Sequence, residues 1–155
     1  PSKTFNLAGL TTACAVIPDA ALRRRFAAVA RGLTPDGNVL GLVAAEAAYG
    51  QGEPWRQALL EVLRGHRQAL VERVACWPGV TMSAPESTYL AWLDLRQAPA
   101  LAGSESPQQA LLERAGVALS DGADFGTPGF ARLNFGTTAT QLEAALARLD
   151  GVLGG

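Results

Sequence analysis

The feature that most constrains the fold is a change of hydrophobic periodicity in the middle of the chain. Between Glu53 and residue 76, apolar residues recur every three or four positions, which is the spacing of one helix face. Pro54 suits the first turn of such a helix, and Pro78-Gly79 would end it. After residue 79 the pattern changes to short segments of mixed type. We therefore predict a two-layer α/β unit over 51–155, entered by a long helix over about 53–76.

Two later segments have the composition of β-strands. Residues 88–95 are rich in strand-forming residues and apolar on both faces, which is typical of a central strand. Residues 130–135 alternate between apolar and polar side chains, as a half-buried strand does. The other elements predicted here are a helix over 106–114 closed by Gly116, a short strand over 117–120, and a last helix with Thr140 and Glu143 as its capping box.

The first fifty residues have a different, mainly helical pattern. Residues 1–12 are small and polar and indicate a loop, and the apolar run over 13–17 predicts a buried strand. Asp19 is a plausible cap for a helix with apolar residues at helical spacing. A second helix over 39–49 is alanine-rich, with Glu46 as its single charge, so we expect it to be buried on most sides.

Charge and cysteine content exclude several classes of function. Lysine and arginine together number 13 and aspartate and glutamate 14, so nothing indicates a nucleic-acid groove or a polybasic membrane surface. No apolar run approaches the roughly 18 residues that a membrane helix needs. Cys14 and Cys76 suit a reducing compartment, and no His/Cys cluster indicates a metal site. We expect a cytoplasmic protein that binds neither nucleic acid nor membrane nor metal.

Lys3 is the single lysine of a chain whose other basic residues are all arginine. A position that keeps lysine in such a background is a candidate for an amine that can lose its proton, which arginine cannot do in practice. A deprotonated lysine is a nucleophile that forms Schiff bases with carbonyl compounds. The alternative from the residues alone is a solvated surface lysine near the end of the chain.

Arg132 lies in the predicted strand over 130–135. On a strand it shares one face with Phe130 and Asn134, and an arginine in a short apolar strand needs an anionic partner. Its planar fork matches a carboxylate with two parallel hydrogen bonds. The residues leave two interpretations open: a site for a bound carboxylate, or an internal salt bridge.

Several segments together resemble a known family. Residues 2–10, Ser-Lys-Thr-Phe-Asn-Leu-Ala-Gly-Leu, resemble the cofactor-lysine segment of pyridoxal-phosphate (PLP) enzymes of the aspartate aminotransferase superfamily, fold type I. Residues 53–55, 87–96 and 132–136 are similar to its cystathionine β-lyase branch, the MalY/PatB type of C–S lyase. The resemblance covers essentially the whole chain, in order.

The resemblance implies a fold, a cofactor and site residues. It implies the C-terminal part of an aspartate-aminotransferase-like α/β protein, with 1–50 as a remnant of the large PLP-binding domain and 51–155 as the small domain. Lys3 would hold PLP and move the proton at the substrate α-carbon, with Ser2 near the cofactor phosphate. Arg132 would bind the α-carboxylate of a small amino-acid substrate. Members of the family are homodimers, so we expect a homodimer here.

The activity that the resemblance implies is β-elimination from cystathionine or related cysteine S-conjugates, releasing thiol, pyruvate and ammonia. Many aminotransferases carry a phosphate-contacting arginine where Thr11 and Thr12 stand, which favours the lyase. One alternative is an aminotransferase acting between an amino acid and a 2-oxo acid. Another is a non-catalytic regulatory or binding module of the same fold. We expect the chain to be a fragment of a longer protein and to be inactive alone.

Overall fold

The computed structural model describes residues 1–34 and 37–154, which form two compact units. The first unit is Pro1–Leu59 and the second is Leu60–Gly155, so the boundary falls within a helix, α3 (Glu53–Val74). The assignment of 1–50 to a larger cofactor domain and of 51–155 to a small domain stays a prediction.

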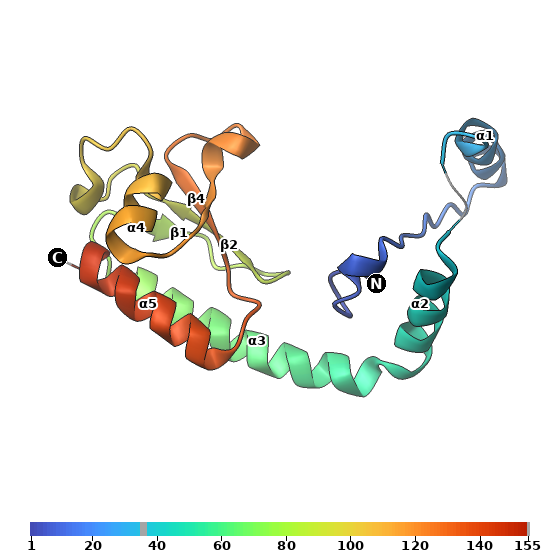
Figure 1. Ribbon diagram of the computed structural model, residues 1–155, viewed down its shortest axis with the longest axis horizontal. Helices are drawn as coiled ribbons and strands as arrows, with labels where there is room; N and C mark the ends of the chain where they lie inside the picture. Colours follow the sequence, from blue (N-terminus) through green and yellow to red (C-terminus); the bar gives the residue numbers. More distant parts are fainter. Residues whose placement is uncertain (35–36, 155) are drawn as a thin grey trace. The chain divides into compact units, whose positions relative to one another are not determined.

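The second unit contains an antiparallel sheet of four strands in the order β1-β2-β4-β3. Figure 1 labels β1, β2 and β4 of this sheet. The two central strands pair along their full lengths, and Trp92 stands opposite Arg132 in their register. The sequence predicted both central strands, although each is shorter than expected. The strands are β1 (Thr81–Met82), β2 (Leu90–Asp94), β3 (Ser120–Asp121) and β4 (Phe130–Asn134).

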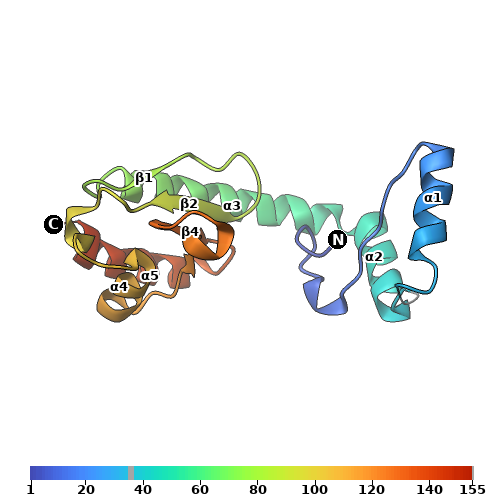
Figure 2. The ribbon, with the colours of Figure 1, turned by 90° about the horizontal axis from the view of Figure 1, so that it is seen from above.

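Three helices pack on one face of this sheet, and the core lies between the two layers (Figures 1 and 2). They are α3, α4 (Pro107–Ala115) and α5 (Ala139–Leu153). Alternate strand residues such as Leu93 and Leu133 are buried against them. The predicted two-layer α/β fold is confirmed. The helices contribute Leu70, Val74, Ala110, Leu111, Ala115, Leu142, Leu146, Leu149 and Leu153 to the core.

The helix caps agree with the sequence in one case and differ in another. Helix α4 begins after Ser106, whose hydroxyl accepts a hydrogen bond from the Gln109 amide, and ends at Gly116 with a φ of 64°. For α5, however, Thr138 is the N-cap, and its hydroxyl accepts from the Gln141 amide. The predicted capping box of Thr140 and Glu143 is wrong because Thr140 already lies inside the helix.

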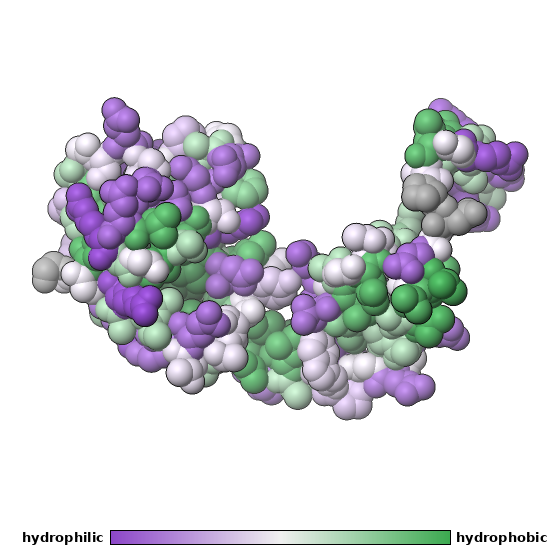
Figure 3. All heavy atoms as spheres, viewed as in Figure 1, coloured by the Kyte–Doolittle hydropathy of each residue, from purple (hydrophilic) through white to green (hydrophobic). Residues whose placement is uncertain are grey.

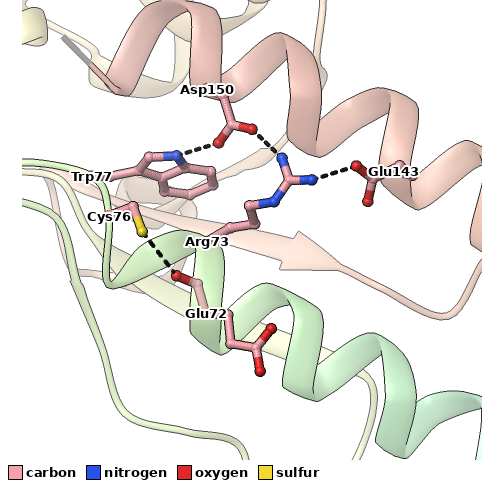
Figure 4. Close-up of polar contacts among 6 residues, drawn as sticks. All are labelled: Glu72, Arg73, Cys76, Trp77, Glu143 and Asp150. Carbon is pink, nitrogen blue, oxygen red and sulfur yellow. Dashed lines mark hydrogen bonds and ion pairs between the residues drawn. The ribbon is translucent and has the colours of Figure 1, made fainter.

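A polar cluster joins α3 and α5 at one end of the core (Figure 4). Arg73 forms ion pairs with Glu143 and with Asp150, and the indole of Trp77 donates to Asp150 at 2.7 Å. Glu143, expected to cap α5, thus contacts α3 instead. These contacts fix the two helices to each other at the surface of the core.

Among the described residues of this unit, no α-helix covers the opposite face of the sheet. A short 3-10 helix, η3 (Gly122–Phe125), packs against β4, and a second, η2 (Pro99–Leu101), lies after β2. Along β4, Ala131 and Leu133 are buried while Arg132 is half-buried, which is the alternation expected of a strand with two different faces. Arg132 therefore points away from the helical layer.

The first unit is helical, with η1 (Ala8–Leu10), α1 (Ala20–Ala30) and α2 (Val39–Gln51). Asp19 caps α1 as predicted, its carboxylate accepting from the Leu22 amide. The strand predicted over 13–17 is wrong: these residues are extended but unpaired, and Val16 is 86% exposed. A strand needs a neighbour for its backbone hydrogen bonds, and the described part of this unit holds no other strand.

Apolar side chains of the first unit are largely exposed. Helix α2 buries only Gly41, so the prediction that it is buried on most sides is wrong for this structure. The apolar stripe of α1 is exposed as well, and Figure 3 shows hydrophobic residues gathered at the surface over α1 and α2. The exposed side chains are Leu22, Phe26, Val29, Leu33, Val39, Leu40, Leu42, Val43 and Tyr49.

Two properties of the described residues concern membranes and metal ions. No helix among them combines the length and the apolar character that crossing a bilayer requires. Among the same residues, no group of three or more His, Cys, Asp or Glu side chains is arranged to hold a metal ion.

Candidate functional site

The segment around Lys3 is a compact loop held by its own backbone. The Phe5 amide donates to the Pro1 carbonyl at 2.9 Å and the Leu7 amide to the Ser2 carbonyl at 3.1 Å. The Ser2 hydroxyl donates across the loop to the Thr12 carbonyl, over a longer distance of 3.4 Å. Lys3 thus stands on a folded turn, with the start and end of the loop in contact.

Phe5 anchors this loop on the end of α2. Its ring meets Tyr49 edge-on at a centroid distance of 5.6 Å and lies 6.4 Å from the ring of Trp55. Gly52 leaves the space for it, since a Cβ there would come within 2.8 Å of the Phe5 ring. Phe5, two positions after Lys3, is therefore packed against other aromatic rings, whereas Lys3 takes no part in this packing.

Lys3 is exposed, and its amine makes no hydrogen bond or ion pair within the described residues. Ser2 is half-buried beside it. The amine is thus available to a ligand, and the adjacent hydroxyl makes only the long contact to Thr12. Arg132, the other predicted site residue, belongs to the second unit.

Arg132 is held by a hydroxyl and an aromatic ring. Its Nη2 donates to the Ser120 hydroxyl at 3.1 Å, and its Cζ lies 4.5 Å from the ring centroid of Phe125. Among the described residues no Asp or Glu forms an ion pair with it. The structure therefore gives no support to the internal salt bridge, the alternative that the sequence left open.

Three aromatic rings form a row on the same face of the sheet, which we call the aromatic row: Phe125, Trp92 and Phe130. Trp92 meets Phe125 edge-on at 5.7 Å and stacks on Phe130 at 5.8 Å. An arginine stands at each end, Arg132 over Phe125 and Arg96 over Phe130 at 4.7 Å. The two arginines differ in their partners, because only Arg96 forms an ion pair with a carboxylate.

That partner is Asp94, which receives two hydrogen bonds from the Arg96 guanidinium at 2.9 and 2.8 Å. The hydrogen bond from Arg96 holds the pKa of the Asp94 carboxyl below its ordinary value. Arg96 is therefore neutralised within the fold. Arg132, in the matching position at the other end of the row, keeps a guanidinium with free donors.

A hollow of about 660 Å³ lies between residues 116–120, the end of β4 and α5. Of the described residues that border it, two are arginines, Arg132 and Arg148, and none is acidic. Its polar lining is completed by Ser120, Asn134, Thr137 and Gln141. Because Leu142, Ala144 and Ala145 of α5 also border it, this hollow lies toward the helical layer, whereas the Arg132 guanidinium lies against Phe125 on the open face of the sheet.

Sequence reasoning placed Arg132 on the correct face but missed the residues that hold it. Ser120 and Phe125 contact the guanidinium, yet they lie 12 and 7 positions earlier in the chain. Ser120 stands opposite Arg132 in the β3–β4 register, and no pattern in the sequence specifies that register. The one sequence signal for these contacts was Phe125, an aromatic residue in the short loop before β4.

Comparison with known proteins gives the chain a family. The profile of the class I and II aminotransferases matches residues 1–149. Protein MalY of Escherichia coli is 37% identical over 155 residues, covering 96% of this chain and 39% of its own. The cystathionine β-lyase PatB of Bacillus subtilis is 36% identical, covering 99% and 40% respectively.

Solved structures agree with these matches. A crystal structure of OvoB superposes with a TM-score of 0.90 at 42% identity, covering 99% of this chain and 39% of that one. Other matched structures are described as PLP-dependent or PLP-bound enzymes, among them a C–S lyase. The chain spans about 40% of the length of the relatives that it matches.

Proposed function

The chain belongs to the class I and II aminotransferase family, and on that premise we propose that the protein carrying it is a PLP-dependent C–S β-lyase. The substrate would be cystathionine or a related cysteine S-conjugate, and the products a thiol, pyruvate and ammonia. The observation that carries the proposal is Arg132, a half-buried arginine with no acidic partner among the described residues, in a chain with MalY and PatB as relatives.

The residues around Lys3 fit the chemistry of the proposed cofactor. PLP carries an aldehyde and a phosphate, and needs a primary amine and hydrogen-bond donors as partners. The Lys3 amine has no competing partner among the described residues, and its loop is fixed by backbone hydrogen bonds and by Phe5. Ser2 supplies a hydroxyl whose present contact, at 3.4 Å, is weak enough to be exchanged for a phosphate oxygen.

Arg132 would bind the α-carboxylate of the substrate. A guanidinium has five N–H donors, and the structure uses one of them for Ser120. The remaining donors suffice for a two-pronged contact with a carboxylate. Such a contact fixes the substrate at one end and so sets the direction of its Cα–H bond.

Lys3 would then act as the base of the reaction. When bound, PLP supplies an electron sink for the carbanion that forms at the substrate α-carbon. The Lys3 amine would take the Cα proton, and the electron pair left at Cα would expel the sulfur from Cβ. The departing sulfur would take a proton and leave as a thiol. Addition of water to the remaining three-carbon unit gives pyruvate and ammonia.

An assay without any added 2-oxo acid tests the proposal. The protein loaded with PLP is incubated with cystathionine, and pyruvate and free thiol are measured together. A lyase releases both in equal amounts over many turnovers. Pyruvate that requires an added 2-oxo acid, or no pyruvate at all, contradicts the lyase.

An aminotransferase is the second candidate, favoured by one comparison. The aspartate aminotransferase of Geobacillus stearothermophilus is 34% identical over 110 residues, or 68% of this chain. The same amine and the same arginine would serve that reaction, with Lys3 moving the proton of the substrate α-carbon, Arg132 binding the carboxylate, and no thiol leaving. Transfer of the amino group to an added 2-oxo acid, without loss of sulfur, would identify this activity.

The remaining expectations are part of the proposal. We infer a homodimeric, cytoplasmic enzyme in which residues 1–50 belong to a cofactor domain and 51–155 to a small domain. The exposed apolar residues of α1 and α2 support the assignment of residues 1–50 to a larger cofactor domain. An apolar surface of that extent is normally covered in the working protein.

A further inference from the structure

We propose that Phe125 and Ser120 are positioning residues that hold the Arg132 guanidinium in the orientation in which it accepts a substrate carboxylate. The inference rests on the function proposed above for Arg132. It goes beyond that function by naming what orients the arginine, and by assigning one end of the aromatic row to substrate binding.

The two contacts constrain Arg132 in complementary ways. The ring of Phe125, 4.5 Å from the guanidinium carbon, favours a cation over its face and so limits where the group can lie. The Ser120 hydroxyl, 3.1 Å from Nη2, accepts one N–H and so limits how the group can turn. Neither contact neutralises the charge, so the guanidinium is oriented while it keeps its attraction for an anion.

Orientation matters here because arginine has a long, flexible side chain. Phe125 and Ser120 already restrict the conformations of this side chain in the free protein. Binding of a carboxylate therefore costs less conformational entropy. A bidentate contact is especially demanding, since both oxygens must meet the same planar group. Support by Phe125 and Ser120 therefore increases affinity for carboxylates specifically.

Phe125 is itself held in place by the backbone of η3. The Asp121 carboxylate accepts from the Ala123 amide at the start of this turn, and Gly126 closes it with a φ of 77°. Gly122 packs so closely that a Cβ would come within 2.4 Å of the Thr127 carbonyl oxygen. The ring is thus carried on a tight turn whose backbone leaves it little freedom to move.

The exposure of Phe125 argues against a role in the core alone. The residue is 49% exposed, and its ring contacts Trp92 and Arg132 on the face away from the helical layer. Phe130 offers a matched comparison, because it is also in the aromatic row and also lies under an arginine. Its arginine, Arg96, is already paired with Asp94 and has no proposed ligand.

The test compares leucine variants of these two phenylalanines in the full-length protein loaded with PLP. The probe is 2-methylalanine, an amino acid with an α-carboxylate but no α-proton, and its dissociation constant is measured by calorimetry. We expect Phe125→Leu to weaken binding about 3- to 10-fold, because the cation–π support is lost. Phe130→Leu should change it less than about twofold, and Phe125→Tyr should keep near-normal affinity.

A second pair of variants separates this inference from the function on which it rests. Ser120→Ala should also weaken the binding of 2-methylalanine. In a protein that already carries Arg132→Ala, neither Ser120→Ala nor Phe125→Leu should weaken this binding further. Equal losses in Phe125→Leu and Phe130→Leu, or an undiminished loss in the Arg132→Ala background, would overturn the positioning role alone. If Arg132→Ala itself leaves binding unchanged, the proposed role of Arg132 is wrong, and the positioning role with it.

Discussion

The indole N–H of Trp77 donates to the Asp150 carboxylate at 2.7 Å, and the same carboxylate forms an ion pair with Arg73. Trp77 follows the end of α3 and Asp150 lies near the end of α5, so one side chain joins the two helices (Figure 4). Trp77 is only 3% exposed, and its N–H would lack a partner without Asp150. Glu143, more exposed, pairs with Arg73 at the surface.

Asp150→Ala should therefore destabilise the protein more than Glu143→Ala does. Loss of Asp150 leaves the buried indole N–H unpaired, which costs about 1–3 kcal/mol of unfolding free energy. Loss of Glu143 removes an exposed ion pair worth about 0.2–1 kcal/mol. Urea unfolding of both variants measures the difference. Equal losses would show that the indole hydrogen bond contributes nothing beyond a surface ion pair.

The Asp94–Arg96 pair predicts a pH dependence of stability. Since the hydrogen bond from Arg96 lowers the pKa of Asp94 in the folded protein, the pair stabilises the fold above the unfolded-state pKa of about 3.9. That contribution is lost as the pH falls through the lower, folded-state pKa. Urea midpoints of the protein and of Asp94→Asn should differ at pH 7 and converge in acid. A constant difference down to pH 2.5 would contradict the assignment.

Lys3→Arg should abolish turnover while it preserves the fold. The substitution keeps the positive charge of this exposed position, but a guanidinium neither forms the bond to PLP nor gives up a proton at working pH. Borohydride reduction of the unaltered protein loaded with PLP, followed by peptide mapping, should place the label on Lys3. A label on another residue, or activity retained by the variant, would refute the role.

Arg132→Lys should weaken the binding of amino-acid substrates far more than it weakens the binding of the cofactor. Lysine keeps the charge but loses the planar fork, so a two-pronged contact becomes a single one. Loss of a charge-assisted hydrogen bond of this kind is worth about 1.5–3 kcal/mol, or roughly 10- to 100-fold in kcat/KM. Steady-state kinetics and a PLP titration measure the two effects. Normal kcat/KM with poor PLP retention would instead make Arg132 a cofactor residue.

The two units should differ in their ability to fold alone. All fully buried hydrophobic side chains of the described residues lie between Leu70 and Leu153, within the second unit. A polypeptide of residues 60–155 should therefore unfold cooperatively in urea, followed by circular dichroism. A polypeptide of residues 1–59 should show no such transition, because it has almost no core of its own. A cooperative transition in the shorter polypeptide would contradict this reasoning.

Sequence patterns predicted the second unit well because its core is contained within it. The periodicity over 53–76 and the alternation over 130–135 reflect side chains that meet each other in the same unit. In α3, His66 is buried together with Leu70 and Val74 on the face that packs on the sheet. The errors here are small shifts, such as the cap at Thr138 rather than Thr140, where neighbouring threonines offer similar capping chemistry.

The first unit was predicted less well because its hydrophobic pattern lacks a partner within the described residues. The apolar run over 13–17 has strand character, but no neighbouring strand pairs with it. The apolar residues of α2 indicated burial, yet their side chains are exposed in this unit. Periodicity reports that a surface is suited to burial and does not identify what covers it.

In the candidate site, the sequence identified Lys3 and Arg132 but not the residues that contact Arg132. Arg132 could be placed on its strand face from alternation alone, and Lys3 stood out by composition. The partners of Arg132 could not be predicted, since Ser120 reaches it through strand register and Phe125 through a 3-10 turn. Both depend on tertiary geometry that a linear pattern does not encode.

The two faces of β4 have separate consequences for how such a protein can diversify. Ala131 and Leu133 point into the helical layer, and changes to them alter stability. Arg132, between them, points the other way and contributes nothing to that core. A lineage could therefore exchange the residue at position 132 or its neighbours on the open face, and acquire a new ligand preference, with little effect on its ability to fold.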